Sequence, residues 1–324
     1  MWVMAFVGAA SAFVESTLAQ IYKERDGEAF RGGPAYYIEK ALGSRFFGII
    51  FALLLIACFI FGFNGLQSYN VSSALAYYFD DQHLAGLLVG CILTIASAAV
   101  IFGGVHRIGI ISSTIVPIMA GLYIILGIYI TLSNASQLPS IFQMIFQNAF
   151  DVQAIFGGFA GSCVMHGIKR GLFSNEAGMG SSPISHASVD DANAVEQGFW
   201  GIFEVFFDTM VVCVLTALVV LSSGLLSDGM DGAALTIACF EQGFGKAGGI
   251  IFAFSIIAFA IPSILGWYYY ASECIRYLFT SKWVIHIYNG IFLILLVQGC
   301  CMQLSNVWEI ADTLNGCMAI PNLI

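Results

Sequence analysis

Two carboxylates inside one apolar run are the side chains of this sequence best suited to carry charge or protons. Glu204 and Asp208 lie within residues 197–222, four residues apart, so a helix presents both on one face. A carboxylate inside a membrane span costs about 2.5–3.5 kcal/mol, and we therefore expect both to face the interior of a helix bundle. Two roles are open: a structural pair bonded to neighbouring helices, or a pair that carries protons.

Amide side chains mark the centre of another long apolar segment, residues 46–79. Asn64, Gln67 and Asn70 recur every three residues, so they share one face of a helix. Amides at membrane depth must face protein or a cavity. Each is therefore predicted either to bond a neighbouring helix or to contact a ligand.

A proline and a hydroxyl lie together in the apolar run 248–272. Pro262 removes one helical hydrogen bond and frees a backbone carbonyl, and Ser263 adds a hydroxyl beside it. Carbonyl and hydroxyl oxygens are ligands that a hard monovalent cation uses in membrane proteins. A plain proline kink has the same pattern, so the sequence leaves both interpretations open.

The stretch KRGLFSNEAGMGSSP, residues 169–183, follows a short, glycine-rich apolar segment. Its glycines allow close backbone packing or positive φ, and its serines and asparagine can bond free backbone groups. The pattern is typical either of a capped helix end or of the inner end of a broken transport helix that gates a solute site. The gating or structural positions are Ser174, Asn175, Glu176 and Gly178.

Composition sets the class of protein. The 324 residues are 59% hydrophobic and only 10% charged, whereas a soluble domain is about 25% charged, so we expect a polytopic membrane protein. The net charge of −9 and the lack of a basic patch exclude a nucleic-acid partner. Nine cysteines without a CxxC pair predict neither a metal site nor a disulfide framework. No nucleophile–base pattern stands out, so we expect neither an enzyme nor a cofactor.

Apolar segments alternate with polar loops along the whole chain. The predicted spans are residues 1–20, 46–79, 84–103, 110–132, 154–168, 197–222, 248–272, 283–302 and 307–324. Residues 32–39 and 141–150 read as short amphipathic helices at the membrane surface, and residues 223–247 read as an outer loop. With loop 21–45 placed in the cytoplasm, that side receives every Lys and Arg except Lys246. We therefore expect a multi-pass protein of the plasma (inner) membrane.

Three motifs carry a family resemblance: GGPAYYI at 32–38, KRGLFSNEAGMGS at 169–181 and ILGWYY at 264–269. They resemble the alanine/glycine:cation symporter family, the sodium:alanine symporters, and the resemblance runs along essentially the whole chain. It implies a LeuT-type fold of two inverted five-helix repeats. It also implies inward transport of alanine or glycine, with sodium as the coupling ion.

The resemblance implies a register for the chain. Residues 1–132 would supply helices 2–5 of the first repeat, residues 133–153 an external connection, and residues 154–324 helices 6–10 of the second repeat. The glycine- and threonine-containing motif of the family's helix 1 has no match in this sequence, and the last segment stops within helix 10. We therefore expect a chain truncated at both ends.

The resemblance also implies roles for single residues. The substrate-binding set would be Gln67, Gly157, Gly161, Ser162 and Trp267. Its glycines and serine would lie where helix 6 unwinds around the amino acid, and Trp267 would wall a small pocket. Ser263 and the backbone at Pro262 would bind sodium, although the family has threonine and serine at these two positions.

Sodium-coupled symport of small neutral amino acids by alternating access is the function that these expectations favour. Proton coupling through Glu204 or Asp208 is one alternative. A truncated membrane protein that transports nothing is the other.

Overall fold

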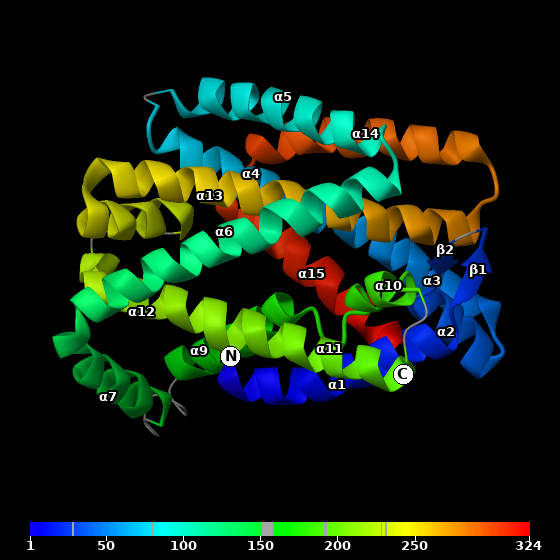
Figure 1. Cartoon of the computed structure of the whole chain (residues 1–324), viewed down its shortest axis with the longest axis horizontal. Helices are drawn as coiled ribbons and strands as arrows, with labels where there is room; N and C mark the ends of the chain where they lie inside the picture. The colour runs from blue at the N-terminus through cyan, green and yellow to red at the C-terminus, as the bar shows by residue number, and fades with distance from the viewer. Residues whose placement is uncertain (28, 80, 151–157, 191–192, 228, 231) are drawn as a thin grey trace.

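The protein is a bundle of long helices, described here by a computed structural model of residues 1–324 except 28, 80, 151–157, 191–192, 228 and 231 (Figure 1). Seven helical segments in the described residues are long and apolar enough to cross a membrane. They are α1 (Trp2–Ile21), α3 (Arg45–Ala57) with α4 (Asn64–Ala76), α5 (Gln82–Ile101), α6 (Val105–Ser133), α11 (Ala194–Phe206) with α12 (Val214–Ser223), α13 (Gly232–Leu278) and α14 (Lys282–Cys300). The chain is therefore an all-α polytopic membrane protein, as its composition predicts.

Two further long helices cross the bundle but are less apolar than these seven. They are α9 (Gly158–Asn175) and α15 (Leu304–Leu323), and α15 runs obliquely through the middle of the molecule (Figure 1). The shorter elements are α2 (Pro34–Leu42), α7 (Leu138–Ala149), α10 (Ser182–Ala187) and two 3₁₀ turns, Ala135–Gln137 and Leu225–Ser227. Helices α2 and α7 confirm that the two predicted segments form short helices, and the first half of α2 is buried in the protein.

Two local features depart from the sequence-based expectations. A two-stranded antiparallel hairpin, β1 (Glu24–Asp26) with β2 (Ala29–Arg31), lies in the loop before α2. The predicted outer loop 223–247 is wrong over most of its length, because the helical segment begins at Gly232 and breaks only at Gly245, where φ is 67°. This segment is helical because it packs an apolar face inward: Phe240 stacks on Phe252 at 4.3 Å between ring centroids.

Two membrane-spanning segments contain a π-helical turn, at Cys58–Phe63 between α3 and α4 and at Phe207–Cys213 between α11 and α12. A π turn holds an extra residue and therefore shifts the side chains that follow around the helix axis. The first turn places Phe59 and Phe63 in the core, where both are fully buried. The second turn contains Asp208 and Thr209, and both contact the end of α9.

Packing positions the site through helices that are far apart in sequence. Helix α1 packs along α11, α4 packs against both α13 and α14, and α5 lies beside α14 at one edge of the bundle (Figure 1). The largest buried side chains of the main core include Phe51, Phe63 and Phe292. Large apolar side chains also remain exposed along the outer faces of the long helices, as expected for surfaces that meet lipid.

Candidate functional site

The chain leaves helical geometry between α9 and α10, at residues 176–181, which we call the junction. Glu176, Gly178 and Gly180 have φ values of 50°, 83° and 82°. Glycine adopts such values without strain, whereas a β-carbon at Gly180 would lie 2.6 Å from Pro34 and 2.8 Å from the ring of Phe51. The chain thus breaks sharply at the junction, and this geometry agrees with both interpretations of the glycine-rich motif.

A buried carboxylate from α1 fixes the junction from one side. The backbone N–H of Gly178 donates to Glu15 at 3.2 Å. The side chain of Asn322 in α15 donates to the same carboxylate and to the carbonyl of Gly178, the latter at 3.1 Å. Tyr37 of α2 donates to the Asn322 amide oxygen. Elements from both ends of the sequence therefore meet at one residue, Gly178.

Glu176 fixes the junction from the other side. Its carboxylate accepts a hydrogen bond from the Ser181 hydroxyl at 2.6 Å and another from the Trp267 indole at 3.2 Å. Burial raises the pKa of Glu176, and this effect outweighs the two hydrogen bonds, which lower it. Trp267 is therefore hydrogen-bonded directly to the junction.

The two acids of the α11–α12 span contact the same motif. The hydroxyl of Ser174 donates to Asp208, and that of Thr209 donates to Asn175. Glu204 accepts from Ser182 at 3.0 Å and lies 3.2 Å from Nε2 of His186. These bonds to neighbouring elements agree with the structural interpretation of the pair.

One part of the expectation for these acids is wrong. The side chain of Glu204 is 53% exposed and does not lie in the interior of the bundle. Its partners Ser182 and His186 both belong to α10, so the carboxylate is satisfied there without burial.

Aromatic rings continue from Trp267 towards α15. Trp267 meets Phe63 edge-on at 5.0 Å between centroids, and Phe63 stacks on Phe173 at 4.8 Å. Arg170 lies 3.7 Å from the ring centroid of Trp308 and pairs with Asp312. We call Phe63, Phe173, Trp267 and Trp308 the aromatic wall.

The other residues proposed for substrate binding are divided between α4 and α9. Gln67 lies one helical turn after Phe63 on α4 and is half-buried. Gly157 lies outside the described residues. Gly161 and Ser162 lie within helix α9, so the predicted unwinding at these two positions is wrong. Glycine permits a break but does not require one, and the chain breaks at the junction instead.

The proposed sodium ligands lie in an unbroken part of α13. The helix continues through Pro262, which is buried, and the hydroxyl of Ser263 donates to the carbonyl of Phe259 at 3.0 Å. A hydroxyl that donates to a carbonyl keeps its lone pairs for a cation.

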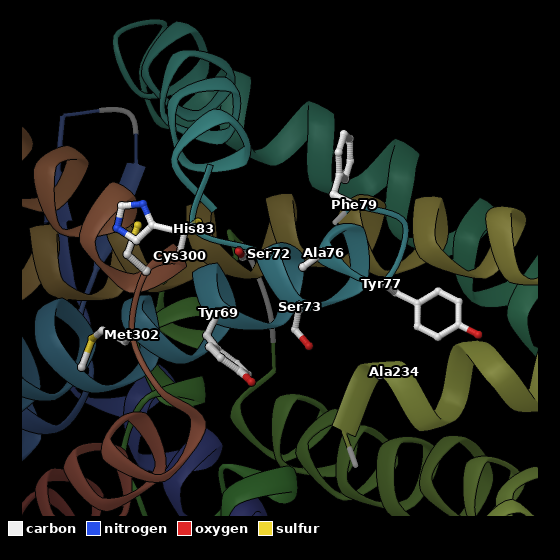
Figure 2. Close-up of a pocket in the computed structure, with 11 residues that line it drawn as sticks. Tyr69, Ser72, Ser73, Ala76, Tyr77, Phe79, His83, Ala234, Cys300 and Met302 are labelled. Carbon is white, nitrogen blue, oxygen red and sulfur yellow. The ribbon is translucent and has the colours of Figure 1, made fainter. Parts of the chain in front are cut away.

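A cavity of about 540 Å³ lies where α4 ends and α5 begins. Figure 2 shows the side chains of Tyr69 and Ser73 pointing to the same side of α4. His83, Cys301 and Met302 also line this cavity, which we call the outer pocket. Among the residues that the structure describes, its lining offers hydroxyl, imidazole and sulfur groups but no Asp, Glu, Lys or Arg, which suits a solute without net charge.

Sequence reasoning missed the partners of the junction. Glu15 and Asn322 bond it from 163 and 144 residues away, and no local spacing marks such contacts. The only available signal was a single carboxylate in an otherwise apolar segment at Glu15.

Comparison with known proteins identifies the family. The sequence matches the profile of the "Sodium:alanine symporter family" over residues 1–324. It is 41% identical to "Amino-acid carrier protein AlsT" and 41% identical to "Probable sodium/glutamine symporter GlnT", both of Bacillus subtilis (strain 168). It is 40% identical to "Sodium/alanine symporter AgcS" of Methanococcus maripaludis. These matches cover 100% of this chain and 69%, 67% and 72% of the respective relatives.

The match over the full chain agrees with the motifs at 32–38, 169–181 and 264–269, and with the bundle of membrane-spanning helices. Members of the family are transporters rather than enzymes. The chain therefore belongs to the sodium:alanine symporter family.

Proposed function

We propose that the chain carries out sodium-coupled symport of a small neutral amino acid, alanine or glycine, by alternating access in a LeuT-type fold of the plasma membrane. The observation that carries this proposal is the direct link between the aromatic wall and the junction, through the hydrogen bond from Trp267 to Glu176. A residue proposed to contact the solute is thereby bonded to the break proposed to gate its path.

The order of helices supports two repeats, residues 1–132 and 154–324, joined by 133–153. In each half a short helix precedes the long central span: α2 precedes α3, and residues 232–244 precede the rest of α13. Helices at matching positions pack together, with α1 on α11, α4 on α13 and α5 on α14. An inverted repeat produces this pairing.

The proposed solute site lies between α4, α9 and α13. The amino group of the solute would meet the side-chain oxygen of Gln67, and the solute would lie against the small residues Gly161 and Ser162 of helix α9. Trp267 would limit the side chain to hydrogen or methyl. Sodium would bind the Ser263 hydroxyl and the carbonyl freed by Pro262, and its gradient would drive the cycle.

In this proposal the junction is the inner gate and the outer pocket is the entrance. Ser174, Asn175, Glu176 and Gly178 hold the gate through their bonds to α1, to the π-helical turn before α12, and to α13. Loop 21–45 lies in the cytoplasm, because this orientation places nearly all Lys and Arg on that side.

Uptake into proteoliposomes tests the proposal. We expect alanine and glycine uptake to require an inward sodium gradient, and choline in place of sodium to abolish it. Uptake that is independent of sodium, depends on a proton gradient and is abolished by Asp208→Asn would show proton coupling in place of sodium coupling. Absence of any amino-acid uptake by folded protein would overturn the transport proposal itself.

The relative named as a glutamine symporter makes the substrate a separate question. If Trp267 sets the size limit, Trp267→Ala raises glutamine uptake relative to alanine, whereas Trp283→Ala, at an exposed position on α14, leaves the ratio unchanged. Equal ratios in both variants would exclude Trp267 as the size filter.

A further inference from the structure

A second cavity, of about 300 Å³, lies between α2, the start of α3 and the end of α13. It is far from the outer pocket, because Arg45 and Tyr77 lie at opposite ends of the long α3–α4 segment. Four cationic side chains line it, together with two acids and two tyrosines. The cations are Arg31, Lys40, Arg45 and Arg276.

The acids at this cavity are already engaged. Lys40 pairs with Glu24 at 3.0 Å, and Glu39 accepts a hydrogen bond from Tyr277 at 2.5 Å. Arg31 pairs with Asp26, also at 3.0 Å. These contacts pair two of the four cations with carboxylates. Arg276 is paired more loosely, at 3.7 Å from Glu273, and Arg45 has no carboxylate partner among the described residues.

Arg45 and Arg276 make no hydrogen bond within the part of the chain that the structure describes. Nε of Arg276 is buried without a partner, and its nearest carboxylate, that of Glu273, is 3.7 Å away. Arg45 meets only the face of the Tyr277 ring, at 5.7 Å from the centroid. The side chain of Arg276 is 38% exposed, but its Nε is buried, and a buried N–H without a partner is costly, so an acceptor is missing at this nitrogen.

The missing acceptor matches a phosphate group. The planar donors of guanidinium bind phosphate oxygens in pairs, and two arginines can hold one phosphate from two sides. Arg45 is the first residue of a membrane-spanning segment, so the cavity lies at the depth of lipid headgroups. We propose that Arg45 and Arg276 form a phosphate-binding site, filled by an anionic lipid headgroup or by free phosphate.

Such a phosphate bridges two long spans. Arg45 begins α3 and Arg276 lies near the end of α13, and these two helices pack against each other. The site uses none of the residues proposed for the solute, so its occupancy is measurable without transport.

Native mass spectrometry of the purified chain tests the site. We expect phosphatidylglycerol to be retained in preference to phosphatidylcholine, and Arg45→Gln with Arg276→Gln to weaken retention about tenfold or more. Arg107→Gln is the matched control, since Arg107 is an exposed arginine in the first turn of α6, at the side proposed as cytoplasmic. The variant Arg45→Lys with Arg276→Lys keeps the charge and should bind with intermediate strength, which separates recognition from loss of folding.

Inorganic phosphate as a competitor distinguishes the two sources. Retention of phosphatidylglycerol that millimolar phosphate does not reduce supports a lipid site. Phosphate that displaces the lipid, and that raises the melting temperature of the parent but not of the glutamine variant, supports a site for the free ion. Equal lipid retention by the parent and both variants, with no effect of phosphate, overturns the proposal.

Discussion

At the scale of residues, the junction depends on side chains that combine opposite hydrogen-bonding roles. Asn322 accepts from Tyr37 while it donates to Glu15 and to a backbone carbonyl. Only an amide offers both an acceptor and two donors at one position. The sequence marked the Gly/Ser/Asn motif itself, because its composition is local, but it could not mark Asn322, because that contact arises only from folding.

His186 gives a prediction on pH. Nδ1 of His186 lies 2.8 Å from the Gln197 side-chain oxygen, and Nε2 lies 3.2 Å from Glu204, so both ring nitrogens face acceptors. Burial lowers the pKa of His186, but the hydrogen bond and charge of Glu204, together with Gln197, outweigh burial and raise it above 6.5. The imidazolium therefore stabilises the fold fully below pH about 6.5, and this contribution is lost as the pH rises through the raised pKa.

Melting temperatures between pH 5.5 and 8.5 check this prediction. We expect the parent to lose about 1 kcal/mol at most, since Glu204 is exposed to screening. His186→Gln should remove the dependence. If the parent protein gains stability as the pH rises over this range, the imidazolium of His186 does not stabilise the fold.

At the scale of elements, the helices follow from apolar periodicity, whereas their irregularities do not. The spans at 84–103, 110–132 and 283–302 match α5, α6 and α14 closely, because continuous apolar runs leave little choice of structure. The π-helical turn at Cys58–Phe63 and the break at Gly245 were not predicted. Each depends on which neighbour the side chains meet, and a window of sequence does not contain that neighbour.

A comparison of two glycines distinguishes the cost of backbone strain from the cost of steric crowding by an added β-carbon. Gly180 and Gly224 have φ values of 82° and 73°, but of the two only Gly180 has atoms within 4 Å of the point that a β-carbon would occupy. We expect Gly224→Ala to destabilise by about 1 kcal/mol from strain, and Gly180→Ala to destabilise by several times more, because Pro34 and Phe51 block the methyl group. Thermal unfolding of both variants in detergent measures the difference. Similar losses would show that the junction tolerates a side chain.

At the scale of the whole molecule, composition alone indicated a multi-pass membrane protein, and the helices agree with it. The packing of the two halves could not be read from apolar runs, since these fix where a helix lies in sequence but not its neighbours. The solute site shows the same limit. Gln67 and Trp267 come from helices that contact each other, yet only the family resemblance placed them in one site.

Chemical labelling from outside the cell checks the orientation of the molecule. Cys301 is exposed and lines the outer pocket, which faces outwards if loop 21–45 is cytoplasmic. We expect a membrane-impermeant maleimide to label intact cells that express the chain, and Cys301→Ser to remove most of that signal. Labelling that requires permeabilised cells would reverse the orientation.

The π-helical turn at Phe207–Cys213 makes the span sensitive to deletion in a specific way. Removing one residue, for example Val211, restores ordinary α geometry while shortening the span by only about 1.5 Å. The residues before and after the deletion then change register relative to each other, so Ser174 cannot keep its contacts to both Asp208, which precedes the deletion, and Cys213, which follows it. The span can lose this length, but it cannot lose the arrangement of side chains that contact α9. The extra residue of the π-helical turn therefore determines which side chains face α9.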